Sequence, residues 1–436
     1  MLRRASLLAA AVLPIVVSLS CGGGASSPAA VPTPATTAAA TPAPNLGPPN
    51  VVLILADDMG WGDLGSYGNT AIKTPNLDRL AAEGARFTAF YVPAPICAPS
   101  RAGLMTGRFP GRTGIPWNPP DKLHDDEVVV AEVLKARGYA TGMVGKWHLG
   151  WVAEDMPIHH GFDFYYGIPA GEDEADFVLG DQPTKDTVGP DQLARRYTQE
   201  ALKFITANKD RRFFVYIAHR DPHLPNSPPA DFAGRSAGGS YGDTIEALDA
   251  TVGDLMKGLK DLGLDQNTLV LFTSDNGPVI PPKGPGSAGP FSGAKGSCEE
   301  GGVRVPGIAR WPARIRAGRV VNEPVSTLDL FPTLVALTGA VLPSRHYDGQ
   351  DISRLLTGDV DRIGGSGIDG GREIAFFGQS GAAGLRSGRW KYLRPGLWSG
   401  TTTLFDLEAD PGEKHDLSRE RPDLVRQLED RLQGLL

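Results

Sequence analysis

Four aliphatic runs recur along the first two thirds of the chain, and they constrain its fold more than any other feature. They are expected to be strands over residues 50–56, 139–145, 213–218 and 268–273, with helix-like segments between them. Apolar runs without alternation are typical of strands that are buried on both faces. Strands that alternate with helices predict an α/β fold, with a large, mostly parallel sheet flanked by helices.

The pattern changes near residue 372. The stretches REIAFFGQ, GLRSGRWKYLR and TTTLFDLEAD are typical of short antiparallel strands, and RPDLVRQLEDRLQGLL predicts a closing helix. We therefore expect a large α/β domain over residues 50–371 and a small α+β domain over residues 372–436.

The first residues of the chain predict export. MLRR is a charged start, ASLLAAAVLPIVV an apolar core, and SLSC ends at Cys21, so residues 1–21 resemble a bacterial lipoprotein signal peptide. Residues 22–49 contain almost only small residues and proline, which predicts an unfolded tether. The expected location is the bacterial periplasm or cell envelope, with a lipid anchor to the membrane through Cys21. The alternative is cleavage and secretion without a lipid.

The net charge and the cysteine content limit which binding partners and which disulfide bonds this chain can have. The net charge is −7, which argues against a nucleic-acid binder but allows a local cationic pocket. Only Cys97 and Cys298 remain beyond the leader. An exported protein permits a disulfide between them, but each lies in a loop beside candidate site residues, which favours two free thiols.

Polar clusters follow the expected strands: DDMG, GKWHLG, HRDPHLP and SDNG. Because ligands bind beyond the carboxyl ends of parallel strands, these clusters are expected to meet in one site. Asp57, Asp58, Asp275 and Asn276 are oxygen ligands suited to Ca²⁺ or Mg²⁺. The alternative is turn chemistry, since Asp and Asn are common in turns.

The remaining polar residues of these loops are cations and histidines. Arg101, Lys146 and Lys295 have no obvious carboxylate partners in register, which favours binding of a ligand. Together with a metal, the set could neutralise and protonate a tetrahedral oxyanion ester; its members are Arg101, Lys146, His148, His219, His223 and Lys295. HRDPHLPN matches a kinase pattern, but no glycine-rich ATP loop or D-F-G accompanies it. The Lys295 loop also lacks the G-K-[ST] ending of a P-loop.

Two longer motifs carry a family resemblance. PICAPSRAGLMTG, residues 95–107, contains C-x-P-x-R at the start of a helix expected to run on from Arg101, and GYATGMVGKWH covers residues 138–148. From residue 50 to its end, the chain resembles formylglycine-dependent sulfatases of the alkaline phosphatase superfamily. The resemblance implies hydrolysis of sulfate esters.

The resemblance also implies a role for each candidate residue. Cys97 is expected to be oxidised to formylglycine by a separate formylglycine-generating enzyme, and Arg101 to steady the aldehyde hydrate. One Ca²⁺ is expected on Asp57, Asp58, Asp275, Asn276 and residue 97 itself. Asp275 would also help deprotonate the attacking hydroxyl. The sulfate oxygens would contact Lys146 and Lys295, the leaving oxygen His223, and the second hydroxyl His148.

One position departs from the family pattern. Many relatives have a serine shortly after GIP, where this chain has Ala170 and Gly171 in an acidic loop. We take this difference to concern substrate preference. Two other functions remain open: a phosphate mono- or diesterase using the same site, and a catalytically inactive, tethered binder of sulfated glycans.

Overall fold

The computed structural model describes residues 47–118, 122–169, 177–184, 188–396 and 400–436. These residues belong to one compact unit. The expected signal peptide, Cys21, nearly all of the tether, and Ala170 and Gly171 lie outside the described residues. No helix of the described chain is both long and apolar enough to span a membrane.

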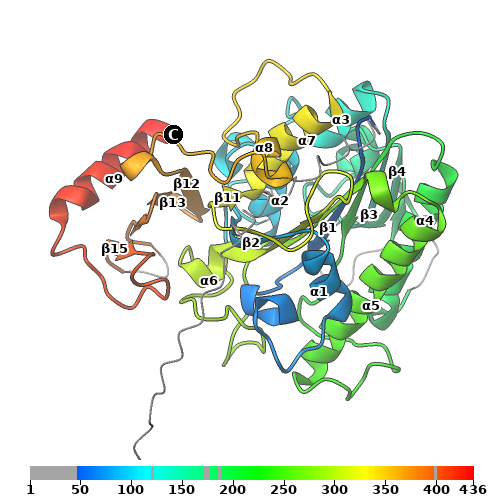
Figure 1. Cartoon of the computed structure of the whole chain (residues 1–436), viewed down its shortest axis with the longest axis horizontal. Helices are drawn as coiled ribbons and strands as arrows, with labels where there is room; N and C mark the ends of the chain where they lie inside the picture. The colour runs from blue at the N-terminus through cyan, green and yellow to red at the C-terminus, as the bar shows by residue number, and fades with distance from the viewer. Residues whose placement is uncertain (1–46, 119–121, 170–176, 185–187, 397–399) are drawn as a thin grey trace, which may run out of the picture. The chain divides into compact units, whose positions relative to one another are not determined.

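A large sheet forms the centre of the fold (Figure 1). Its strand order is β10-β2-β9-β8-β1-β7-β3-β4-β5-β6, with β11 paired to β2. The strands are β1 (Asn50–Ala56), β2 (Ala85–Tyr91), β3 (Ala140–Lys146), β4 (Phe164–Ile168), β5 (Val178–Leu179), β6 (Gln182–Pro183), β7 (Phe213–Ala218), β8 (Thr268–Ser274), β9 (Arg304–Arg310), β10 (Arg319–Val321) and β11 (Val325–Ser326).

The four expected strands are β1, β3, β7 and β8, and they lie next to one another in parallel as β8-β1-β7-β3. Antiparallel pairing involves β9, between β2 and β8, and the short strands β5 and β6. All seven residues of β1 are buried, as expected for a strand covered on both faces. The predicted α/β class is therefore confirmed.

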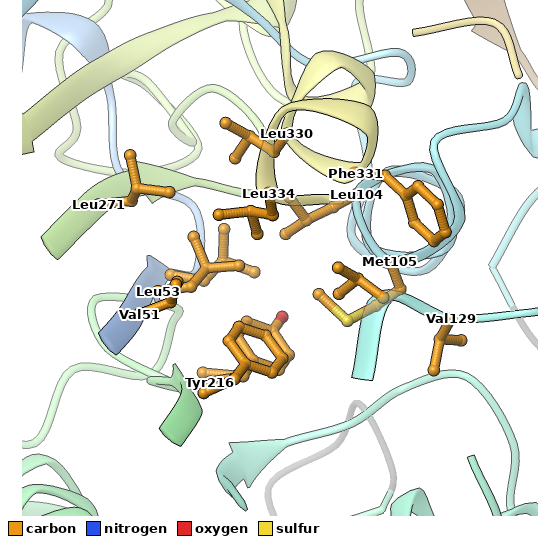
Figure 2. Packing of buried hydrophobic residues seen from close by; sticks show 14 of the residues in the cluster. Val51, Leu53, Leu104, Met105, Val129, Tyr216, Leu271, Leu330, Phe331 and Leu334 are labelled. Atoms are coloured by element: carbon orange, nitrogen blue, oxygen red, sulfur yellow. The ribbon is translucent and has the colours of Figure 1, made fainter. Parts of the chain in front are cut away.

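Helices cover both faces of this sheet. The helices are α1 (Pro75–Ala82), α2 (Cys97–Thr106), α3 (Val130–Ala136), α4 (Leu193–Ala207), α5 (Gly239–Asp261), α6 (Glu300–Val303), α7 (Leu330–Thr338), α8 (Ser353–Thr357) and α9 (Pro422–Leu435). Residues of α2, α3, α7 and α8 form one core with alternate residues of β1, and residues of α1, α4 and α5 form another with the remaining ones. Figure 2 shows the first core, where Leu104, Leu330 and Leu334 pack over Val51 and Leu53.

A second, antiparallel sheet follows, as predicted near the C-terminus. Its strands are β12 (Glu373–Gly378), β13 (Gly381–Ser387), β14 (Trp390–Leu393) and β15 (Thr403–Asp406). Leu424, Leu428 and Leu432 of α9 are buried in one cluster with residues of this sheet (Figure 1). The domain boundary at residue 372 stays a prediction.

One element begins earlier than predicted. The helix expected to run on from Arg101 is α2, and it begins at Cys97, so that Cys97 and Arg101 both lie in its first turns. Pro99 is compatible with this start, because the amide groups of a first helical turn have no partner within the helix. The backbone amides of the turn that begins at Cys97 therefore lie at the N-terminal end of α2, where the helix dipole stabilises anions.

Candidate active site

Two acidic pairs lie side by side because β1 and β8 are parallel and in register. Ala56, the last residue of β1, is paired with Ser274, the last of β8. Asp57 and Asp58 therefore emerge beside Asp275 and Asn276. The backbone amide of Asp58 donates a hydrogen bond to Oδ1 of Asp275 at 3.2 Å.

The same edge of the sheet supplies a lysine and two histidines. Lys146 is the last residue of β3, and His148 follows two residues later. His223 lies in the loop after β7, the strand between β1 and β3. Asp58 and His148 have φ angles of 64° and 62°, and non-glycine residues with positive φ tend to mark functional sites.

Arg101 connects α2 to this edge of the sheet. Its Nε donates to Oδ2 of Asp275 at 2.8 Å, and its Nη1 donates to the carbonyl of Lys146 at 2.8 Å. A second guanidinium nitrogen lies 3.4 Å from Oδ2 of Asp57. The side chain is fully buried, so these contacts fix the position of α2 against the ends of β1, β3 and β8.

Arg101 and both lysines have carboxylate partners, so the expected lack of partners for these three cations was wrong. Lys146 Nζ lies 2.5 Å from Oδ2 of Asp57, and Lys295 Nζ lies 2.7 Å from Oδ1 of Asp58. The partners come from loops far apart in sequence, so no regular spacing in the sequence indicates these pairs. Three cations thus balance the three carboxylates Asp57, Asp58 and Asp275.

The charges and burial of the site set its protonation. Burial would raise the pKa of Asp57, but Lys146, His223 and Arg101 outweigh it and hold this pKa well below its usual value. Burial and the nearby charge of Asp57 raise the pKa of Asp275 to about 6. Burial, followed by the charge of Asp57, also raises the pKa of the Cys97 thiol. The thiol is therefore protonated, with Sγ 3.4 Å from Oδ1 of Asp57.

The histidines differ in their surroundings. His148 is buried, and its Nδ1 has no hydrogen-bond partner among the described residues. Burial and the charges of Lys146 and Arg101 lower its pKa well below the usual value, so it is neutral. His223 Nδ1 lies 2.7 Å from the carbonyl of Leu224, and its Nε2 lies 3.7 Å from Oδ2 of Asp58. The site therefore includes His223, whereas His219 is fully buried and has a pKa lowered to about 3 by burial.

The donor set fits a hard divalent cation. Ligand atoms of Asp57, Asp58, Cys97 and His223 lie within 4.8 Å of one another, and this group includes His223 but not the expected ligand Asp275. Asn276 donates through Nδ2 to Oδ1 of Asp58, while its buried Oδ1 has no partner among the described residues. An orphaned amide oxygen beside carboxylates is what an oxygen-liganded ion such as Ca²⁺ needs. Cys97 and Cys298 are both free, so the disulfide alternative is excluded.

Sequence reasoning missed a buried ion cluster that holds the Lys295 loop. Glu413 accepts a hydrogen bond from the backbone amide of Glu300 at 2.6 Å. Lys391 of β14 lies 2.9 Å from Glu300 and 3.0 Å from Glu413. The hydroxyl of Ser292 in the same loop donates to the carbonyl of Gly412 at 2.6 Å. No local pattern marks these partners, because the C-terminal segment meets the loop only in the fold.

A large, mostly parallel sheet with acidic and basic side chains gathered at one edge is an architecture that this chain shares with known proteins. A family model described as "Sulfatase" matches residues 49–340. The chain is 41% identical over 431 residues to human arylsulfatase A, covering 85% of this chain and 83% of that one. It is 37% identical over 437 residues to the N-acetylgalactosamine-6-sulfatase of Canis lupus familiaris, covering 85% and 82%.

A solved structure agrees with these relatives. It is described under the metabolism of multiple glycosaminoglycans by Bacteroides thetaiotaomicron, and it is 30% identical with a TM-score of 0.80, covering 89% of this chain and 99% of that one. The chain belongs to the sulfatase family, and it is an enzyme that hydrolyses sulfate esters. The family predicted from the two sequence motifs is thus confirmed.

The ion cluster makes stability depend on pH through Glu413. Burial, opposed by Lys391 and reinforced by Glu300, raises the pKa of Glu413 from 4.5 to about 7. Folding therefore favours the protonated carboxyl, and the wild type should lose stability relative to Glu413→Gln as the pH rises from 4.5 to 7. The difference should reach at most ~3 kcal/mol and then level off. Urea unfolding at several pH values measures it.

Glu408→Gln is the matched control, because Glu408 is exposed and paired only with Arg389. Its unfolding curve should follow the wild type at every pH. Parallel pH profiles for Glu413→Gln and the wild type would show that Glu413 does not titrate in this range.

Proposed function

We propose that this sulfatase uses a formylglycine at position 97 and one Ca²⁺ bound beside it. The observation that carries the proposal is the position of Cys97, buried at the start of α2 with its Sγ 3.4 Å from Asp57. The sequence there is C-x-P-x-R, the family's modification motif. The proposed ligands of the ion are Asp57, Asp58, Asp275, Asn276 and residue 97, and the ion would supply positive charge beside the nucleophile.

The surroundings of Cys97 disfavour the thiol itself as the nucleophile. Its raised pKa keeps the proton on sulfur, whereas nucleophilic cysteines have lowered pKa values. A hydrated formylglycine would supply two hydroxyl groups, one to attack sulfur and one whose deprotonation expels the sulfate. Arg101 lies one helical turn after residue 97, and in this proposal it steadies the hydrate while Asp275 accepts the proton of the attacking hydroxyl.

Lys146 and Lys295 would bind the sulfate oxygens. Each is within 3 Å of a carboxylate that the proposal assigns to the metal. When a cation shares those carboxylates, the ammonium groups become available to the anionic substrate. Positive groups positioned where negative charge develops in the transition state are a main source of catalysis.

The two histidines would move protons. The Nδ1–H of His223 donates to the Leu224 carbonyl, so Nε2 carries a proton only in the charged imidazolium. In that state it protonates the leaving alcohol oxygen. His148 is neutral and has a free ring nitrogen, so it accepts the proton of the second hydroxyl as sulfate departs. The substrate would be an aryl or carbohydrate sulfate, in line with the names of the relatives.

The proposed modification of residue 97 can be tested directly. Peptide mass spectrometry of residues 87–101 should detect the aldehyde in protein made together with a formylglycine-generating enzyme. Cys97→Ser should keep its melting temperature but lose steady-state turnover of an aryl sulfate by roughly 10²-fold or more. The reason is that a serine sulfate has no second hydroxyl with which to release its product.

Cys298→Ser is the control, since Cys298 is the other free thiol of the described residues and has no role in the proposed chemistry, and it should retain activity on the aryl sulfate. Full activity with an unmodified Cys97, or wild-type turnover by Cys97→Ser, would exclude the formylglycine mechanism. Parallel assays with the matching aryl phosphate test the esterase alternative: a higher kcat/KM for the phosphate would overturn the assignment of sulfate as the preferred ester.

The proposed calcium site can be tested by its effect on stability. Calcium at about 100 times its Kd should stabilise the protein by ~2.7 kcal/mol, because the ion binds the folded state. Asp58→Asn should abolish this increment, measured as the melting-temperature difference between calcium and chelator. Asp254→Asn is the matched control, since Asp254 is exposed on α5 and belongs to neither group of described residues that could hold a metal ion. Equal melting of the wild type in calcium and in excess chelator would contradict the site.

We also propose that the enzyme is exported and anchored to a bacterial membrane through Cys21. The supporting observation is the signal sequence that ends at Cys21, followed by the proline-rich tether. The wild type should incorporate a palmitate analogue and sediment with membranes, and Cys21→Ser should do neither. An unlabelled, secreted wild type would leave plain cleavage as the mode of export.

A further inference from the structure

A pocket of about 200 Å³ adjoins the site on the side of the small sheet. Three chain segments and one tryptophan line it: residues 296–299, residues 378–383 around the turn between β12 and β13, residues 393–396 after β14, and Trp117. None of these residues has a role in the proposed chemistry.

Two hydrogen bonds, one to a backbone carbonyl and one to the Asn118 side chain, connect the pocket to the segment around Cys97. Gly296, which follows Lys295, donates its amide to the carbonyl of Pro95 at 2.8 Å. Asn118, which follows Trp117, accepts the amide of Ala98 at 3.0 Å. The lining segments that contain Gly296 and Trp117 are therefore held next to Pro95 and Ala98, which lie before and after Cys97. A substrate that presents its sulfate to residue 97 can extend into this pocket.

The lining excludes a second sulfate group. Arg394, the lining cation, is already paired with Glu429 at 2.6 Å and donates to the carbonyl of Ala382 at 3.0 Å. Glu299 accepts the hydroxyl of Ser297 at 2.8 Å. Among the described residues that line the pocket, no cation is left over for an anion. The pocket therefore suits a neutral group.

The lining instead suits a ring with one apolar face and a polar rim. Trp117 is half-buried and has no partner for its indole among the described residues, and Ala382, Ala383, Leu393 and Pro395 add apolar surface. Gly381 and Gly396 have open space where a side chain would lie, so a ligand can approach the backbone closely there. The amide of Gln379 is exposed at the rim.

We propose that this pocket binds a neutral sugar ring next to the sulfated one, so that the substrate is a sulfated oligosaccharide. This inference rests on the proposed function, since it places the sulfate at residue 97. The pocket is smaller than the roughly 300–1,000 Å³ typical of sites for complete ligands, which fits one ring of a larger substrate. The apolar face of a sugar stacks on Trp117, and its hydroxyls bond the open backbone groups and Gln379.

The test compares three substrates: a phenyl sulfate, a biaryl sulfate, and a sulfated disaccharide with one neutral ring. Trp117→Ala should lower kcat/KM for the disaccharide about tenfold to thirtyfold, as expected for loss of one aromatic contact. It should change kcat/KM for phenyl sulfate less than twofold. Trp117→Phe should restore most of the loss, and Ala383→Trp, which fills the pocket, should reproduce it.

The control is Trp390→Ala, because Trp390 is also half-buried but packs against Arg389 and Arg421 away from the pocket. It should affect all three substrates equally. Equal losses on all substrates for Trp117→Ala, or no loss on the disaccharide, would overturn the inference. A loss confined to the biaryl sulfate would overturn the sugar assignment. Failure of the wild type to hydrolyse any of the three sulfates would instead count against the proposed function.

Discussion

The structure depends on the mutual neutralisation of three buried carboxylates and three cations at one edge of the sheet. Burying a charge costs several kcal/mol unless a partner of opposite sign is fixed beside it. Arg101 meets this need by contacting both Asp57 and Asp275, which lie at the ends of neighbouring strands. The register of β1 and β8, the position of α2 and the lysine pairs are therefore mutually dependent.

The same balance makes binding of a metal and binding of an anion interdependent in the proposed function. Lys146 and Lys295 contact Asp57 and Asp58, so a cation at these carboxylates and the lysines compete for the same oxygens. A sulfate offers the lysines another partner. Binding of the metal releases the lysines for the sulfate, and binding of the sulfate releases the carboxylates for the metal. Each ligand would therefore increase the affinity of the site for the other.

The sequence predicted four neighbouring strands of the large sheet, β8, β1, β7 and β3, because long aliphatic runs and helix ends are local patterns, and it did not predict the other seven strands. Candidate site residues could be chosen for a related reason: they follow strands, and the carboxyl ends of parallel strands share an edge. The neighbour order β8-β1-β7-β3 is not local, so the pairing of Lys146 with Asp57 could not be foreseen. The contacts of Glu413 with Glu300 and Lys391 escaped prediction for the same reason.

The burial of Cys97 has a consequence for the timing of maturation. Its side chain is 2% exposed, and it is enclosed by segments as distant in sequence as Asp57 and Lys295. If Cys97 is oxidised as the proposed function requires, the enzyme that modifies it would have to reach it before α2 docks onto the sheet. Modification and folding of this chain would then be successive events, and a chain that folded too early would be permanently closed to its activating enzyme.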